Sequence, residues 1–403
     1  MPNSAPSEVP ELTDISAETL MNDPYPSFDR MRDLASAVWV ESVRLNLVTR
    51  FDDIVAVERD QEIFASTNPQ SLMNRVMGHS LMRKDDVCHQ VERKAIEPAF
   101  RPRIAKNHWA PIFTGIANDL IDDFAGKGAV DLFDAFAAPM ASRALIEMLG
   151  FEGVSWQDLA NWSQSLMDGV GNYQQDPEIE TRWQIAAKGI DDAINHSLPK
   201  HRAEKNASVL SSMVHAEHPH SPEHPHSPEQ ISANVKVIVG GGLNEPRDAI
   251  LTCILGLLQN ADQAAAAMAD RKCFAAAFEE SIRWVSPIGM YPRRVTQDTV
   301  LGDTLLKAGD QIGICVGAAN RDKTRFDQPE RFDINRPRAH HLAFGAGPHF
   351  CAGSWVSRQM VGEIAVPMIF DRLKNLRLDP NKTAVERGWV FRGPVSLSVV
   401  WDV

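Results

Sequence analysis

The chain has 403 residues, of which 44% are hydrophobic, so it is long and apolar enough to bury one large core or two to three smaller ones. Its formal net charge of −12 argues against nonspecific binding to nucleic acids or to anionic membrane surfaces. No run of about 18 apolar residues predicts a membrane span, and no cationic start with an apolar run predicts a signal peptide. The five cysteines are scattered and lack a CxxC pair, which is typical of a reducing cytoplasm.

The first half of the chain changes from a polar arm to strands and then to helices. Residues 1–20 are polar and proline-rich, and predict a loose arm. Residues 37–65 favour strands with short helices, as in "AVWVES" and "LNLVTRFDDIVAVERD". From about residue 89 to residue 285, apolar residues recur at spacings of three and four, which predicts a mainly helical region.

A tandem repeat interrupts this helical region. Residues 218–229 read "HPHSPEHPHSPE", two copies of one six-residue unit, and predict an exposed loop over residues 215–230. Its four histidines could bind a metal, although nearby prolines favour a mobile solvent loop. Strands and turns are expected again from residue 292 to residue 340. A long helix bent at Pro367 should occupy about 352–374, and "PVSLSVVWDV" should form a final strand.

The segment "HLAFGAGPHFCAG" places one cysteine, Cys351, in a glycine-rich loop just before the predicted helix. Unpaired backbone amides at a helix start stabilise a thiolate. Gly345 and Gly347 let the backbone approach a flat ligand, and His349 adds a donor. A single thiolate without a second cysteine suits haem iron with one axial protein ligand. The alternative is a buried structural cysteine in a tight turn.

Six positions of this segment match the pattern F-G-x-G-x-H-x-C-x-G: Phe344, Gly345, Gly347, His349, Cys351 and Gly353. With them the chain resembles the cytochrome P450 family over about residues 20–403. The resemblance implies a mainly α fold with a smaller β region, in a single domain over residues 1–403. It implies haem b (iron protoporphyrin IX) as cofactor, Cys351 as the iron ligand, and Phe344 and Gly345 at the haem.

Further motifs of the family occur in the same order. "EESIRW" gives Glu280 and Arg283, which lie on one face of a helix, and "PERFDINR" gives Arg336, which in the family completes a charged network with them. Without that third partner, the pair would be a solvated surface pair that contributes little.

The resemblance also implies residues that bind the haem propionates. "CHQVERK" supplies His89 and Arg93, and "RRVTQD" supplies Arg293. Cations are needed there because buried propionates without partners would be costly. The alternative for His89 and Arg93 is an ordinary pair on a helix surface.

The central helix departs from the family, which usually carries an acid followed by a threonine. Here "VIVGGGLNEPRDAI" places Asn244 at the position of the acid and Glu245 at that of the threonine. Pro246 lacks an N–H group and should open the helix at the carbonyl of Gly242. Glu245 is then expected to supply protons, with Asn244 beside it. The alternative is that Glu245 pairs with Arg247 or Arg283.

The segments "SPI", "NEP" and "FRGP" resemble a bacterial branch that contains guaiacol-type aromatic O-demethylases and thiocarbamate-oxidising members. This resemblance implies that Val237, Gly241, Ile288 and Phe391 line the substrate pocket.

Taken together, these resemblances imply a monooxygenase that activates dioxygen and hydroxylates or O-dealkylates a small hydrophobic, aromatic substrate. Electrons from NAD(P)H would arrive through a ferredoxin or a flavin/iron–sulfur reductase that docks near Arg101, Arg103 and Arg358. Neither a nucleic acid nor a membrane is expected as a partner. The alternatives are a peroxide-using haem enzyme and a haem-based gas sensor or carrier without turnover.

Overall fold

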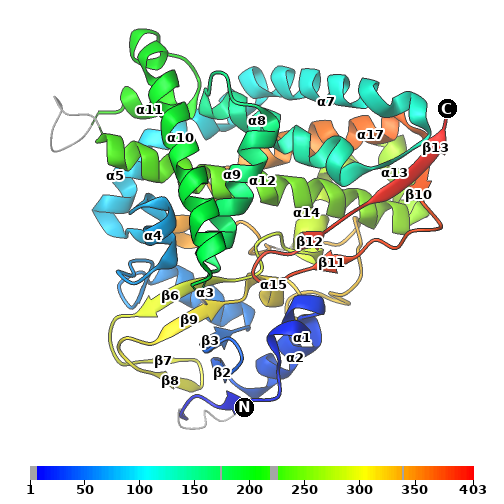
Figure 1. The fold of residues 1–403 in the computed structure, drawn as a ribbon. Helices are drawn as coiled ribbons and strands as arrows, with labels where there is room; N and C mark the ends of the chain where they lie inside the picture. The colour runs from blue at the N-terminus through cyan, green and yellow to red at the C-terminus, as the bar shows by residue number, and fades with distance from the viewer. Residues whose placement is uncertain (1–6, 173–174, 218–225, 338–339) are drawn as a thin grey trace. The chain divides into compact units, whose positions relative to one another are not determined.

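The computed structural model describes residues 7–172, 175–217, 226–337 and 340–403 (Figure 1). The chain forms two compact units, each built from three stretches of sequence. The first unit comprises Met1–Asn68, Leu251–Cys351 and Leu378–Leu397, and the second comprises Pro69–Ile250, Ala352–Arg377 and Ser398–Val403. The single domain expected over residues 1–403 stays a prediction.

A six-stranded sheet organises the first unit, with strand order β1-β2-β3-β9-β6-β4. The pairs β2–β3 and β6–β9 are antiparallel, whereas β3–β9 is parallel. The strands are β1 (Glu11–Leu12), β2 (Val38–Val40), β3 (Leu45–Val48), β4 (Phe64–Ala65), β6 (Tyr291–Val295) and β9 (Gln311–Ile314). Two separate hairpins are β7 (Thr299–Leu301) with β8 (Thr304–Leu306), and β11 (Glu386–Arg387) with β12 (Gly393–Pro394).

The helix α3 packs against this sheet through apolar residues spaced three apart, Phe51, Ile54 and Val57. In α3, Ile54 and Val57 point into a core that also holds Ile312 and Ile314 of β9. That core fixes the last turn of α3, where the site described below begins. The helices of the first unit are α1 (Ala17–Asn22), α2 (Tyr25–Leu34), α3 (Phe51–Arg59), α13 (Ala261–Ala269), α14 (Lys272–Trp284) and α15 (Val316–Ala319).

The expected loose arm over residues 1–20 is wrong for the residues from 7 onward. Strand β1 pairs with β2 in parallel, and Ser16 caps α1 by accepting a hydrogen bond from the amide of Thr19 at 3.0 Å. Leu12, Ile15 and Leu20 are buried in a second apolar cluster. The polar composition of the arm gave no indication of these three buried residues, which pack the arm against the sheet.

The second unit is mainly helical, as the spacing of apolar residues predicted. Its helices are α4 (Leu72–Met77), α5 (Asp86–Ile96), α6 (Pro102–Ile104), α7 (Ala110–Phe124), α8 (Ala138–Leu149), α9 (Trp156–Val170), α10 (Pro177–Ala203), α11 (Val209–Val214), α16 (Ser354–Ser357) and α17 (Val366–Arg372). The strands β5 (Ala129–Asp131), β10 (Lys374–Leu378) and β13 (Ser398–Asp402) form a sheet of order β10-β13-β5. The final strand is therefore confirmed, as is the mainly α fold with a smaller β region.

Short 3₁₀-helical and π-helical segments join these elements. The turns are η1 (Leu81–Arg83), η2 (Glu97–Phe100), η3 (Ala105–Trp109), η4 (Ala125–Lys127), η5 (Phe133–Ala137), η6 (Gly347–His349) and η7 (Arg358–Ala365). Helical winding runs from Ser354 to Arg372, as expected, and η7 is a π-wound stretch that ends just before Pro367. Because proline has no N–H group, a regular ladder cannot continue there.

The helix α12 (Pro228–Gln259) is the longest in the chain and contains Pro246 in its interior. Its start is a capping box, because Ser227 Oγ accepts from the amide of Gln230 while Gln230 Oε1 accepts from the amide of Ser227. Residues 228–230 are thus helical rather than part of the expected loop. The rest of the repeat up to residue 225 lies outside the described residues, and so do His218, His220 and His224 of the expected metal-binding group.

Candidate functional site

The loop that carries Cys351 is closed by a short backbone contact in the first unit. The amide of Cys351 donates to the carbonyl of Phe344 at 2.9 Å, and the turn η6 lies between them. Gly345 and Gly347 have φ of +70° and +67°, which side chains other than glycine rarely adopt. A Cβ on Gly347 would lie 2.2 Å from the carbonyl oxygen of Glu58. Both glycines are therefore needed for this loop to pack on the end of α3.

The thiol of Cys351 is exposed at the end of this loop, directly before α16. By contrast, Cys253 and Cys315 are buried in the core, and burial raises the pKa of both thiols, to about 12 for Cys253. Those two are therefore structural, as most buried cysteines are. The alternative of a buried structural cysteine does not hold for Cys351.

Aromatic and polar neighbours hold the two ends of the loop. The ring of Phe344 lies 6.4 Å from that of Phe278 on α14 and 6.3 Å from that of Phe350. His349 Nε2 lies 3.1 Å from Ser66 Oγ, just after β4. Phe344 thus anchors the loop by packing, and His349 is fixed by a hydrogen bond.

Arg293 lies on β6 with a side chain that is 5% exposed. It donates to the carbonyl of Pro292 at 3.1 Å and lies 3.7 Å from a carboxylate oxygen of Glu58. Because a guanidinium has five N–H donors, most of these remain available for a further anion. This donor set fits the propionate role that the sequence predicts for Arg293.

The predicted network around Glu280 is confirmed. Both carboxylate oxygens of Glu280 accept from Arg283 at 2.7 Å, and Arg336 Nε lies 3.2 Å from one of them. Arg283 also donates to the backbone carbonyls of Asn320 and Pro329. Glu280 and Arg283 are buried, so the alternative of a solvated surface pair is wrong. The network ties α14 to the chain that leads into the cysteine loop.

His89 and Arg93 lie one turn apart on α5, in the second unit. His89 is buried, whereas Arg93 is partly exposed and pairs with Glu97 at 3.2 Å. A buried imidazole with a cation on the next turn is not an ordinary surface pair. Their role toward a propionate stays a prediction.

A stripe of less buried positions runs along α12, which is otherwise largely buried. Val237, Gly241 and Glu245 follow one another at spacings of four, so they share one face of the helix. A Cβ on Gly241 would meet nothing within 4 Å, whereas one on Gly240 would lie 2.8 Å from Met77 Cε. The glycine at position 241 therefore opens one face, and the glycine at 240 allows tight packing.

The expected opening of α12 at Pro246 is not seen, because the helix continues without a break from Pro228 to Gln259. Pro246 removes one N–H donor from the ladder. The neighbouring turns of this long helix are held by their own hydrogen bonds and by packing. One missing bond is therefore tolerated without a break.

The polar cluster after Gly242 leaves Glu245 without a charged partner. Arg247 donates to Asn244 Oδ1 at 2.9 Å, pairs with Asp248 at 2.7 Å and stacks over Phe133. Arg283 is occupied by Glu280, as shown above. The expected alternative, a pair of Glu245 with either arginine, is therefore wrong.

Both carboxylate oxygens of Glu245 are buried, and none of the other described residues hydrogen-bonds to them. Burial raises the pKa of Glu245 to about 7, and the charge of Asp248 adds to this rise. The backbone amide of Glu245 and the charge of Arg247 offset the burial only in part. Near neutral pH this residue can both release and take up a proton.

Ile288 and Phe391 face each other in the first unit, although 103 residues separate them in the sequence. They form an isolated antiparallel bridge, and the amide of Gly289 donates to the carbonyl of Val390 at 2.8 Å. Phe391 is 37% exposed. The structure thus brings together two of the four residues expected to line a substrate pocket.

Sequence reasoning missed two residues at the cysteine loop. Glu58 Oε2 accepts from the amide of Ala346, and Glu58 Oε1 accepts from the hydroxyl of Tyr291. The sequence did indicate that Glu58 is buried, because it follows Ile54 by four residues and so occupies the apolar face of α3. An acid at such a position indicates a specific buried partner.

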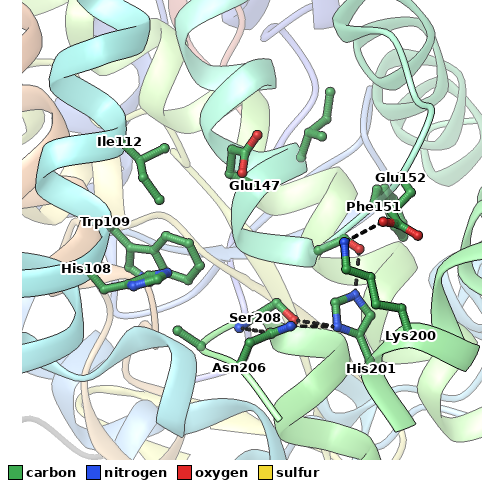
Figure 2. A pocket seen from close by; sticks show the side chains of 13 residues that line it. His108, Trp109, Ile112, Glu147, Phe151, Glu152, Lys200, His201, Asn206 and Ser208 are labelled. Atoms are coloured by element: carbon green, nitrogen blue, oxygen red, sulfur yellow. Dashed lines mark hydrogen bonds and ion pairs between the residues drawn. The ribbon is translucent and has the colours of Figure 1, made fainter. Parts of the chain in front are cut away.

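A separate surface cavity of about 200 Å³ lies in the second unit, where the ends of α8 and α10 meet the segments η3 and α7 (Figure 2). His201 is one of its lining residues and lies 2.7 Å from the carbonyl of Gly150 and 3.0 Å from the amide group of Asn206. Lys200 pairs with Glu152 at the rim. These polar groups hydrogen-bond one another, so they join helix ends rather than offer donors to a ligand.

The arrangement at Cys351 fits haem. The loop presents one exposed thiol, glycines allow close approach, and buried Arg293 keeps donors for an anionic group. Among the residues that the structure describes, no helix is long and apolar enough to cross a membrane. Within those same residues, no cluster of three or more histidines, cysteines or acids could hold a metal ion.

Comparison with known proteins gives one consistent answer. The family model described as "Cytochrome P450" matches residues 254–382. Pulcherriminic acid synthase of Bacillus subtilis is 26% identical over 404 residues, which cover 97% of this chain and 98% of that protein. Cytochrome P450 107B1 of Saccharopolyspora erythraea is 29% identical over 389 residues, or 92% of each chain.

Two further similarities support the same fold. The steroid C26-monooxygenase of Mycolicibacterium smegmatis is 28% identical over 359 residues, which cover 89% of this chain and 88% of that protein. The crystal structure of CalO2 superposes with a TM-score of 0.86 at 27% identity, covering 98% of this chain and 99% of that one. Together with the cysteine loop and the buried Glu280 network, these similarities show a cytochrome P450 fold and support an oxidoreductase of the cytochrome P450 type with haem as its cofactor.

Proposed function

We propose that this monooxygenase hydroxylates or O-dealkylates a small hydrophobic, aromatic substrate, with electrons that come from NAD(P)H through a ferredoxin or a flavin/iron–sulfur reductase. The observation that carries the proposal is the stripe Val237–Gly241–Glu245 on α12, which combines an apolar side chain, an open position and an acid that titrates near neutrality. Such a face suits an apolar substrate and a reaction that consumes protons.

In this proposal Cys351 binds the haem iron and the other residues of the family motifs hold the haem periphery. Arg293 in the first unit, and His89 and Arg93 in the second, donate to the propionates, and His349 adds a donor near the haem. Phe344 and Gly345 give the loop its shape. When bound, haem supplies the activation of dioxygen, so that one oxygen atom enters the substrate and the other leaves as water.

Glu245 supplies the protons that this reaction needs. Asn244 has the supporting role of engaging Arg247, together with Asp248, so that Arg247 forms no ion pair with the Glu245 carboxyl. Since burial keeps Glu245 largely protonated up to about pH 7, its carboxyl can donate a proton and be reprotonated from solvent. An ion pair with Arg247 would lower the pKa of Glu245 and remove this capacity.

The substrate is placed by Val237 and Gly241 on α12 and by Ile288 and Phe391 of the first unit. A methoxy-benzene meets this description, because a ring can pack on Phe391. Hydroxylation of its methyl group by one oxygen atom of dioxygen, with two electrons and two protons, gives water and a hemiacetal. The hemiacetal then breaks down to a phenol and formaldehyde.

The electron donor docks on a cationic part of the second unit. Arg101 and Arg103 are exposed, and Arg358 lies beside the exposed indole of Trp355, 5.5 Å from its centroid. An acidic ferredoxin complements such a surface, which steers association even though the chain as a whole is acidic.

Titration of the ferric protein with ligands tests the proposal. Guaiacol-like methoxy-aromatics should shift the haem spectrum, yield formaldehyde with a ferredoxin system, and bind more tightly than an aliphatic ligand of similar size. A steroid belongs in the same series, because one relative carries the name steroid C26-monooxygenase. Binding of the steroid alone would refute the aromatic assignment. Turnover with peroxide but not with the ferredoxin system would favour the peroxide-using alternative.

A further inference from the structure

Glu58 is a carboxylic acid on the buried face of α3, where a helix normally carries apolar residues. It ends the apolar face of α3, and its side chain is only 1% exposed. Burying a carboxyl is costly unless donors replace the lost water. The structure supplies such donors from two directions, both within the first unit.

The first direction is the loop that carries Cys351. Glu58 Oε2 accepts from the backbone amide of Ala346, five residues before the cysteine. The backbone carbonyl of Glu58 faces Gly347, where a Cβ would lie 2.2 Å away. Glu58 therefore contacts the loop with both its side chain and its backbone carbonyl.

The second direction is the strand β6, which carries the expected propionate ligand. Tyr291 donates its hydroxyl to Glu58 Oε1, and the guanidinium of Arg293 lies 3.7 Å from the same oxygen. The guanidinium also lies 5.1 Å from the centroid of the Tyr291 ring. Glu58 and Tyr291 together orient Arg293 while most of its donors stay available.

We propose that Glu58 is a positioning residue for haem binding, because it holds the Cys351 loop through Ala346 and orients Arg293 through its charge and Tyr291. Neither contact reaches the iron, so the effect is preorganisation: the two groups meant to bind haem are fixed before haem arrives. The inference rests on the proposed roles of Cys351 and Arg293.

Haem transfer from the loaded protein to excess apomyoglobin tests this role, together with the CO spectrum of the reduced protein. Glu58→Leu removes both contacts and should release haem at least about tenfold faster, and part of its long-wavelength CO band should be lost. Glu58→Gln keeps an oxygen for the Ala346 amide but loses the charge beside Arg293, so its haem release should fall between those of wild type and Glu58→Leu. Glu62→Gln, an exposed acid four residues further on, is the matched control and should behave as wild type.

The results of these experiments distinguish a failure of the Glu58 inference from a failure of the thiolate assignment. Unchanged haem release and an unchanged CO band in Glu58→Leu, even with a lowered unfolding midpoint, would show a merely structural residue and overturn the inference alone. A wild-type protein without the long-wavelength band would overturn the thiolate assignment and this inference with it. If Glu58→Leu does not fold, Tyr291→Phe decides, because loss of its hydroxyl should speed haem release about two- to fivefold. Release at the wild-type rate would contradict the role.

Discussion

Glu245→Gln should change how the stability of this protein depends on pH. Burial holds the pKa of Glu245 at about 7 in the folded chain, against 4.5 in the unfolded chain. Between these values the folded protein binds a proton that the unfolded chain has lost, so the free energy of unfolding falls as pH rises from about 5 to about 7. One unit of pKa corresponds to about 1.4 kcal/mol, which puts the total loss at about 3 kcal/mol.

The glutamine has nearly the same shape and stays neutral at every pH. The variant should therefore gain stability relative to wild type between about pH 5 and about pH 7, and the difference should then level off. Urea unfolding of the haem-loaded protein, followed by circular dichroism at a series of pH values, measures this difference. Glu363→Gln, at an exposed position, controls for the loss of a carboxylate. A difference between wild type and Glu245→Gln that does not vary with pH would refute the reasoning.

Four further changes test separate parts of the site. Cys351→Ser should abolish the long-wavelength CO band of the reduced protein, whereas Cys88→Ser should keep it; a band that survives in Cys351→Ser would exclude this ligand. Glu280→Ala leaves buried Arg283 without its counter-charge and should cost about 3–5 kcal/mol in urea unfolding, and a cost under about 1 kcal/mol would contradict the network's role. Phe391→Ala should weaken guaiacol binding roughly tenfold in spectral titrations and spare an aliphatic ligand; equal losses would point to plain core packing. Deleting residues 224–229 should leave haem content and turnover nearly unchanged, because the remaining copy supplies the same cap sequence to α12; a large drop in substrate affinity would place the loop in the access path.

The fold was predictable where the sequence is periodic. Apolar spacings of three and four gave the helical region, and alternation gave β13. The N-terminal arm was mispredicted because its order depends on three buried side chains, Leu12, Ile15 and Leu20, separated by polar residues. Pairing of β1 with β2 is a contact between distant segments, which local composition cannot reveal.

The candidate site was predictable to the extent that its residues stand at fixed spacings. The cysteine loop came from the residues around Cys351 and their match to the family pattern, whereas the network of Glu280, Arg283 and Arg336 came from the family resemblance, because spacing alone left Glu280 and Arg283 as a solvated pair. Glu58 has no fixed spacing to Cys351 and lies 293 residues before it, so only the folded chain shows that it contacts the loop. The pairing of Arg247 was equally hidden, because sequence alone left Glu245 and Arg247 as plausible partners.

In the proposed function, the residue at position 244 bears on how Glu245 would supply protons without the usual acid and threonine. An aspartate or glutamate at 244 would also engage Arg247, but it would bring a second negative charge beside Glu245, in addition to Asp248. That charge would raise the pKa of Glu245 further and hold its proton too tightly for release near neutral pH. Asn244 accepts from Arg247 at 2.9 Å without a charge. Under the proposed role of Glu245, the two departures from the family pattern act together: a neutral amide at 244 would keep the acid at 245 both unpaired and able to exchange its proton.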